Sequence, residues 1–104
     1  MKAVVINPDK SLRYDDVPDP VCAKDEVLIK VAYAALNRAD LMQREGVYPP
    51  PPGAPDWPGL EVSGEVAACG TEATRFRPGD KVCALLGGGG YAQYVAVSEK
   101  HCLP

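Results

Sequence analysis

The chain has no long apolar run, no Cys-x-x-Cys pair and a single histidine, His101. Because a membrane-spanning helix needs about 20 consecutive apolar residues, no such helix is expected. The opening MKAVVINPDK has too few apolar residues before Asn7 and Pro8 to form the core of a secretory signal. We therefore expect a soluble, cytoplasmic protein without a membrane partner, in which His101 is solvated or simply packed.

The cysteines are spaced too widely for a zinc knuckle or ribbon. Without a secretory signal, a disulfide framework is not expected either. We interpret the four residues as small buried or half-buried hydrophobic side chains: Cys22, Cys69, Cys83 and Cys102.

A strong excess of either charge is also missing. Eleven basic side chains stand against fourteen acidic ones, the net charge is −3, and the signs are interspersed. A surface of this kind predicts no nucleic-acid partner. With 104 residues, of which 46% are hydrophobic and 24% charged, the chain has the composition of one globular domain or of part of one.

Short segments of alternating or β-branched residues predict a mainly β protein. In the clearest of them, EVLIKVAYAA, one face carries Val27, Ile29, Val31 and Tyr33. Glycine- and proline-rich turns separate the segments, which is typical of a β-barrel or sandwich. We expect strands at residues 2–7, 11–17 (the more exposed one), 26–35, 61–69, 81–86 and 91–97.

One short helix is predicted within residues 37–46. Asn37 is a favourable N-cap, Asp40 lies at the capping-box position, and Gly46 suits a left-handed end. Asp40 and Arg44 have the spacing of a helical ion pair. Arg38 and Asp40 are interpreted as the solvated first turn of this helix.

The glycine run at residues 87–90 invites comparison with phosphate-binding loops. Such loops lie between a strand and a helix, whereas here the strand-like YAQYVAV follows and no Gly-Lys-Ser/Thr ending is present. We predict a flexible hairpin turn and no nucleotide site within this chain. The neighbouring Tyr91 and Tyr94 are assigned to sheet packing.

Taken in order, the segments KAVVIN, EVLIKVAYAALNRADL, PGLEVSGEVAACG, RPGDKVCALL and GGYAQYVAV resemble the N-terminal, GroES-like domain of the medium-chain dehydrogenase/reductase superfamily. The resemblance extends over nearly the whole chain. It implies a mainly β, GroES-like, partly open β-barrel with one or two short helices. It also implies that residues 1–104 are an incomplete N-terminal substrate-binding and catalytic domain, from which the Rossmann cofactor domain is absent.

Zinc-dependent members of this superfamily carry a cysteine ahead of the R-x-D segment and a histidine before the glutamate of a G-H-E motif. The matching residues here are Asn37 and Leu60, and neither offers the thiolate or imidazole that zinc prefers. We therefore expect no zinc. The stretch ALNRADLMQREGVYPPPPG resembles the zinc-free quinone oxidoreductases related to zeta-crystallin.

This second resemblance implies hydride transfer from NADPH to a quinone or another conjugated carbonyl compound, by an enzyme that is a homodimer when full length. The cofactor would be bound mainly by the domain that is absent here. Asn37 and Tyr48 match positions that line the cleft where nicotinamide and quinone meet. Asn37 would cap the helix with its side chain while its backbone faces the cleft. Glu61 is assigned a structural or supporting role, and Trp57 is expected to pack the proline-rich loop onto the barrel.

Six of the ten residues from 49 to 58 are prolines, and two interpretations of this segment remain. It can be a polyproline ligand for a partner's aromatic groove, or a stiff loop that closes one side of the cleft. We favour the second. The alternatives to the whole assignment are a stand-alone GroES-like β-domain that acts as a binding module, and a relative of the zinc-type alcohol dehydrogenases.

Overall fold

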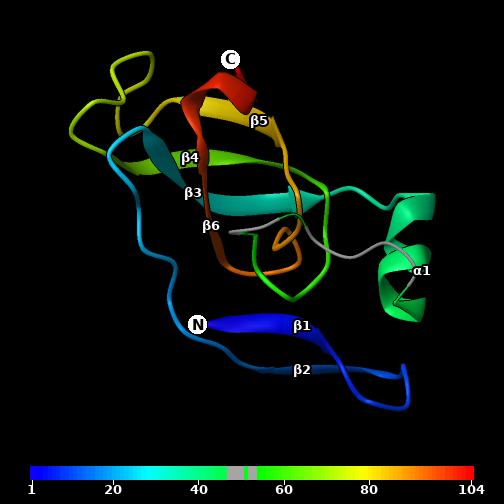
Figure 1. Ribbon diagram of the computed structural model, residues 1–104. Helices are drawn as coiled ribbons and strands as arrows, with labels where there is room; N and C mark the ends of the chain where they lie inside the picture. Colours follow the sequence, from blue (N-terminus) through cyan, green and yellow to red (C-terminus); the bar gives the residue numbers. More distant parts are fainter. Residues whose placement is uncertain (47–50, 52–53) are drawn as a thin grey trace.

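The structure is a computed structural model that describes residues 1–46, 51 and 54–104. In this part of the chain strands predominate, and each predicted strand is present with ends that differ by three residues or fewer (Figure 1). The elements follow in the order β1 (Lys2–Ile6), β2 (Leu12–Asp16), β3 (Glu26–Ala34), α1 (Arg38–Glu45), β4 (Glu61–Cys69), β5 (Lys81–Leu85), β6 (Tyr94–Ser98), the 3-10 turn η1 (Glu99–His101) and β7 (Cys102–Leu103).

Two antiparallel sheets make up the fold. The larger has the strand order β6-β3-β4-β5-β7, and the smaller is the hairpin β1-β2. They meet where Ala3 forms a bridge with Ala92 and the Val4 N–H donates to the Tyr91 carbonyl at 2.8 Å. The larger sheet curls around its buried face, with α1 at one end (Figure 1). The prediction of a mainly β, partly open barrel is confirmed.

The core lies on the inner face of the larger sheet. Val27 and Ile29 of β3 and Val62 and Val66 of β4 are at most 2% exposed, in the alternating pattern that the sequence predicts. Tyr33, expected on the same face, is 77% exposed. The register of β3 against β4 shifts between Val31 and Tyr33. An extra residue in one strand turns the side chains that follow to the other face, so the prediction for Tyr33 is wrong.

The glycine run does not form the predicted hairpin. β5 and β6, which it joins, are separated in the sheet by β4 and β3. The segment crosses between them beside the connector that precedes β4: Gly89 N–H donates to the Trp57 carbonyl at 2.8 Å, and Gly90 N–H to the Gly59 carbonyl at 3.0 Å. The glycines therefore allow this segment to pack closely against the backbone of the connector before β4, and they do not form a tight turn.

Three of the four cysteines are positioned as predicted. Cys102 is buried, Cys22 and Cys69 are half-buried, and all have free thiols. Cys83, however, is exposed, because β5 buries Val82 and Ala84 on its other face. Among the residues that the structure describes, no helix has the length and apolar character needed to cross a membrane.

Candidate active site

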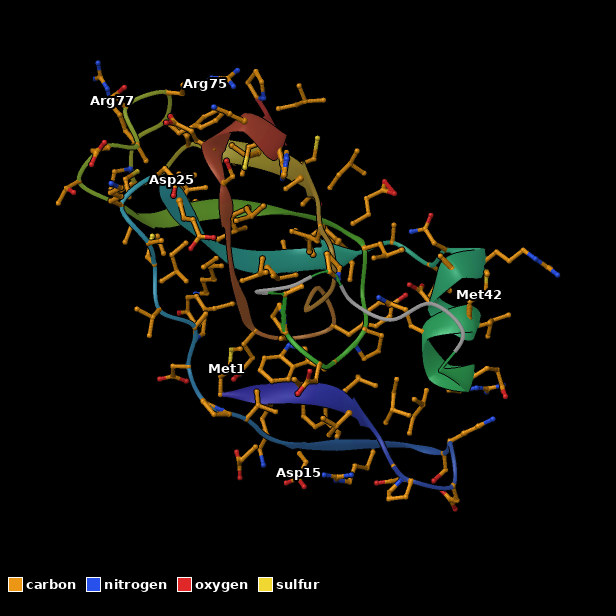
Figure 2. The ribbon with its side chains drawn as sticks, in the orientation of Figure 1. Met1, Asp15, Asp25, Met42, Arg75 and Arg77 are labelled. Carbon is orange, nitrogen blue, oxygen red and sulfur yellow. The ribbon has the colours of Figure 1, made fainter. Side chains whose placement is uncertain are left out.

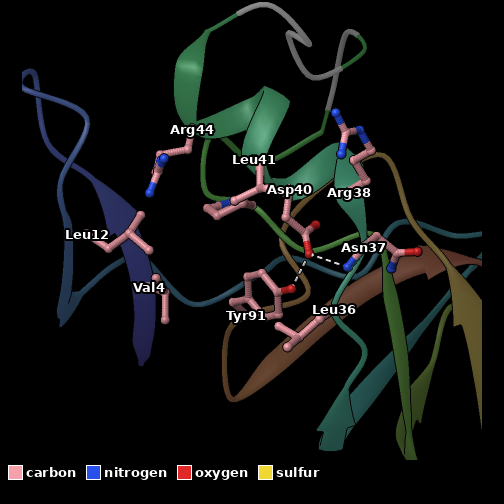
Figure 3. A pocket seen from close by; sticks show the side chains of 10 residues that line it. Val4, Leu12, Leu36, Asn37, Arg38, Asp40, Leu41, Arg44 and Tyr91 are labelled. Atoms are coloured by element: carbon pink, nitrogen blue, oxygen red, sulfur yellow. Dashed lines mark hydrogen bonds between the residues drawn. The ribbon is translucent and has the colours of Figure 1, made fainter.

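A cavity of about 630 Å³ lies between the β1-β2 hairpin and the first turns of α1. Its walls are mostly apolar. Val4 and Leu12 come from the hairpin, and Leu36 and Leu41 come from the start of α1 and the residues before it (Figure 3). Polar groups are concentrated on one side, where α1 begins.

With Asp40 at the predicted capping-box position, Asn37 precedes α1 as its N-cap and has extended backbone angles (φ −133°, ψ 149°). Its backbone N–H donates to Oδ2 of Asp40 at 2.8 Å. The Asn37 side chain, which helps to line the cavity, points away from Asp40 (Figure 3). Its Nδ2 is buried and has no hydrogen-bond partner among the described residues. A donor left in this state costs about 1–3 kcal/mol unless a ligand oxygen accepts from it.

Asp40 and Tyr91 are the residues whose role the sequence interpretation missed. The Tyr91 hydroxyl donates to Oδ2 of Asp40 and also lies 3.1 Å from the Ala35 carbonyl oxygen (Figure 3). Burial, reinforced by the Asp40 carboxylate, raises the pKa of Tyr91, so its hydroxyl remains a proton donor at neutral pH. Asp40 is therefore a half-buried, bonded group and not a solvated one. No pattern in the sequence connects residues 51 positions apart.

Two guanidinium groups border the same cavity, those of Arg38 and Arg44. The predicted Asp40–Arg44 ion pair is not formed, because Asp40 is turned toward Tyr91 and Arg44 pairs with Glu45 at 3.2 Å instead. Lys10 also pairs with Glu45, at 3.3 Å. Figure 2 shows Arg75 and Arg77 at the opposite end of the molecule from α1.

Trp57 and Glu61, two further predicted site residues, lie away from this cavity. Trp57 is half-buried in a separate small hollow beside Tyr94 of β6. Glu61 begins β4 and borders another hollow on the outer face of the sheet, while its backbone carbonyl accepts from the Ala35 N–H at 3.0 Å. Tyr48 falls outside the described residues, as does part of the proline-rich loop.

The donor set at the start of α1 does not fit a zinc ion. Asn37 and Leu60 occupy the two positions discussed above, and neither side chain is a thiolate or an imidazole. Within residues 1–46, 51 and 54–104, no three His, Cys, Asp or Glu side chains come together in a group that could hold a metal. The arrangement can orient a ligand through hydrogen bonds and can shield it from water with apolar walls.

Comparison with known proteins connects this geometry to a family. The model of the alcohol dehydrogenase GroES-like domain matches residues 23–104. The chloroplastic quinone-oxidoreductase QR1 of Triphysaria versicolor is 43% identical over 94 residues, covering 86% of this chain and 29% of that protein. The acryloyl-coenzyme A reductase of Sulfurisphaera tokodaii is 39% identical over 105 aligned residues, covering 96% of this chain and 30% of that protein.

The fold agrees with these sequence matches. The crystal structure of a quinone oxidoreductase from Pseudomonas syringae pv. Tomato superposes with a TM-score of 0.84 at 27% identity, over 98% of this chain and 32% of that one. This chain spans less than a third of the length of each of these relatives. Since the family model covers most of the sequence and the fold is shared, the chain belongs to the alcohol dehydrogenase GroES-like domain family.

Proposed function

We propose that this chain is the N-terminal part of an NADPH-dependent oxidoreductase that reduces a quinone or another conjugated carbonyl compound. The observation that carries the proposal is its membership of the family together with 43% identity to a quinone-oxidoreductase. As in the relatives, which are more than three times as long, further sequence would supply the cofactor-binding domain. We expect the complete enzyme to be a homodimer.

A bound nicotinamide cofactor would supply the hydride. The residues of this chain would bind and orient the acceptor. The buried Nδ2 of Asn37, which has no partner among the described residues, is suited to donate to an oxygen of that acceptor or of the cofactor. Tyr48 is proposed to line the same cleft, and Trp57 and Glu61 to support it. Reduction of an activated carbonyl needs no strong acid or base from these groups, because water or a nearby hydroxyl can deliver the proton.

We further propose that the enzyme works without zinc, because Asn37 and Leu60 replace the soft ligands of the zinc-dependent members. Metal analysis of the full-length protein, purified without chelators, tests this point. A stoichiometric zinc ion that survives dialysis would contradict it.

Two acceptor classes are supported by the relatives, since one is named a quinone-oxidoreductase and another an acryloyl-coenzyme A reductase. Both acceptors are conjugated carbonyl compounds, so the same hydride transfer serves either. We therefore propose to assay a soluble benzoquinone and an α,β-unsaturated thioester in parallel, with NADPH and NADH. A cytoplasmic location stays a prediction, because QR1 is described as chloroplastic.

The test of the proposed function is substitution of Asn37 in the full-length enzyme. We expect Asn37→Ala to lower kcat/KM about 10- to 100-fold through loss of a positioned donor. The matched control is Asn7→Ala, which removes the other asparagine of this chain, a turn residue bonded to Ser11 and Arg13. Both variants lose an asparagine side chain, but only Asn37 is assigned to the cleft.

Activity and stability must be measured together. Loss of an N-cap side chain costs about 1 kcal/mol on its own, so activity is to be measured well below the unfolding transition. If Asn37→Ala and Asn7→Ala retain equal activity, Asn37 returns to a purely structural role. If neither acceptor class supports NADPH or NADH oxidation by the full-length protein, the proposed function is wrong.

A further inference from the structure

Tyr91 connects three segments that surround the start of α1. Its backbone N–H donates to the Pro58 carbonyl at 3.1 Å, and its carbonyl accepts from the Val4 N–H at 2.8 Å. Its side chain reaches back to Asp40 and to the Ala35 carbonyl. The main-chain bonds place the ring so that its hydroxyl lies within hydrogen-bond distance of both the Asp40 carboxylate and the Ala35 carbonyl.

The hydroxyl of Tyr91 and the backbone N–H of Asn37 converge on the same carboxylate oxygen, Oδ2 of Asp40. A chain of hydrogen bonds thus runs from Tyr91 through Asp40 to the Asn37 backbone. The Asn37 side chain extends from this backbone on the side opposite to Asp40 (Figure 3). This chain connects the orientation of the Asn37 amide group to the position of Tyr91, although the two side chains are not in contact.

A capping box alone does not account for this arrangement. Capping requires only that the carboxylate at Asp40 meets the Asn37 N–H. A second bond from a distant tyrosine restricts the rotamer of Asp40, and a charge-assisted bond of this kind is stronger than a neutral one. The raised pKa of Tyr91 keeps the donor protonated at neutral pH.

We propose that Tyr91 is a positioning residue for Asn37: its hydroxyl orients the Asp40 carboxylate, which holds the Asn37 backbone so that the Asn37 amide is presented to the ligand. The inference rests on the proposed function only for the use that is made of Asn37. The coupling between Tyr91 and Asn37 is a property of this chain, and it can be measured without any activity.

The decisive variant is Tyr91→Phe, which keeps the ring and all main-chain bonds and removes only the hydroxyl. Backbone amide exchange of the 104-residue chain is followed by NMR. We expect the Asn37 N–H to exchange about tenfold faster or more, because Asp40 is released. The Val4 N–H is the internal control: its acceptor is the main-chain carbonyl of residue 91, which the substitution retains.

Tyr14→Phe is the matched control variant, since Tyr14 is 66% exposed in β2 and takes no part in this network. It should leave the Asn37 and Val4 amides unchanged. The inference is overturned if the Asn37 amide is unaffected by Tyr91→Phe. It is equally overturned if the Asn37 and Val4 amides accelerate by the same factor, because that result means general loosening.

A second measurement separates this inference from the proposed function. In the full-length enzyme we expect Tyr91→Phe to lower kcat about fivefold or more with little change in KM, and its effect not to add to that of Asn37→Ala. Additive effects would contradict coupling through Asp40. If the enzyme proves inactive with every acceptor, the proposed function fails while the exchange experiment still decides the role of Tyr91.

Discussion

At the scale of single residues, the start of α1 is organised around one carboxylate. Asp40 accepts from Asn37, its neighbour in the helix cap, and from Tyr91, which follows the glycine run. Arg44, four residues further along the helix, has the spacing for an ion pair with Asp40 but forms one with Glu45 instead. Both donors meet the same oxygen, Oδ2, whereas Oδ1 is buried without a hydrogen-bond partner among the described residues. The donors that a half-buried carboxylate finds in the fold need not be the donors nearest in sequence.

Tyr91 should make stability pH-dependent in the alkaline range. Its pKa in the folded chain is raised above the ordinary value of 10.0, so the unfolded chain loses the phenolic proton first. The stabilisation is therefore complete below about pH 10 and is lost as the pH rises further. The free energy of unfolding is to be measured by urea denaturation at about pH 8 and about pH 10.5. We expect it to decrease between these two pH values by about 0.5 kcal/mol less in Tyr91→Phe than in the unmodified chain, after allowance for solvent screening.

Lysines also titrate in this range, so the comparison needs a second tyrosine variant. Tyr14→Phe, which removes an exposed phenol outside the Asp40 network, is the comparison. An equal reduction in both variants would mean that Tyr91 does not carry the effect.

At the scale of elements, two glycine-containing connections are packed against each other beneath the cavity. Gly59 precedes β4 with φ +115°, and a Cβ atom there would lie 2.5 Å from the Tyr91 backbone nitrogen and 2.7 Å from Gly90. The crossing of residues 87–90 from β5 to β6 passes over this point. Because Tyr91 follows directly, the close approach of these two connections determines where its hydroxyl lies.

Gly59→Ala is therefore expected to destabilise the fold by about 3 kcal/mol or more, since backbone atoms cannot move aside. The matched control is Gly79→Ala. Gly79 also has a positive φ, +97°, but a Cβ atom added there would meet no other atom within 4 Å. It should cost only the backbone strain, about 1–2 kcal/mol. Chemical denaturation compares the two, and equal costs would show that the close approach is not limiting.

At the scale of the whole molecule, the two sheets differ in how much they bury. β3 and β4 lie in the middle of the larger sheet and carry the most buried residues of the core, Val27, Ile29, Val62 and Val66. Within the described part of the chain β2 pairs with β1 alone, and four of its five residues are exposed. The cavity at α1 lies along the boundary between the more and the less buried part.

Amide exchange should follow this division. We expect the slowest exchange in β3 and β4, where opening requires global unfolding, and the fastest strand exchange in β2. Exchange measured by mass spectrometry on peptides from residues 12–16 and 61–69 compares them directly. Protection of β2 equal to that of β4 would mean that the hairpin and the larger sheet unfold as one cooperative unit.

Much of the architecture could be predicted from local sequence. Alternation located the strands, because residues on one face of a strand recur with a period of two. Asn37, Asp40 and Gly46 marked the ends of α1, because capping depends on near neighbours. The family resemblance followed from ordered motifs over nearly the whole chain. Each of these signals depends on residues that are close together in sequence.

The predictions that were wrong concern contacts between residues that are far apart in the sequence. The glycine run was predicted to form a hairpin because its flanking segments are both strands, but their places in the sheet separate them. Alternation places Tyr33 on the same face as Val27 and Ile29, but a register shift interrupts the alternation. Tyr91 was assigned to packing because its partner, Asp40, lies 51 positions away.

By itself the sequence determined the fold class, the positions of strands β1 to β6 and of helix α1, and the family. Tertiary structure alone decided which backbone the glycine run lies against, which donors Asp40 accepts from, and in which direction the Asn37 side chain points. The physical reason is that secondary structure follows the periodicity and capping of neighbouring residues, whereas a hydrogen-bonded site at the meeting point of two sheets depends on contacts that exist only after the sheets have packed.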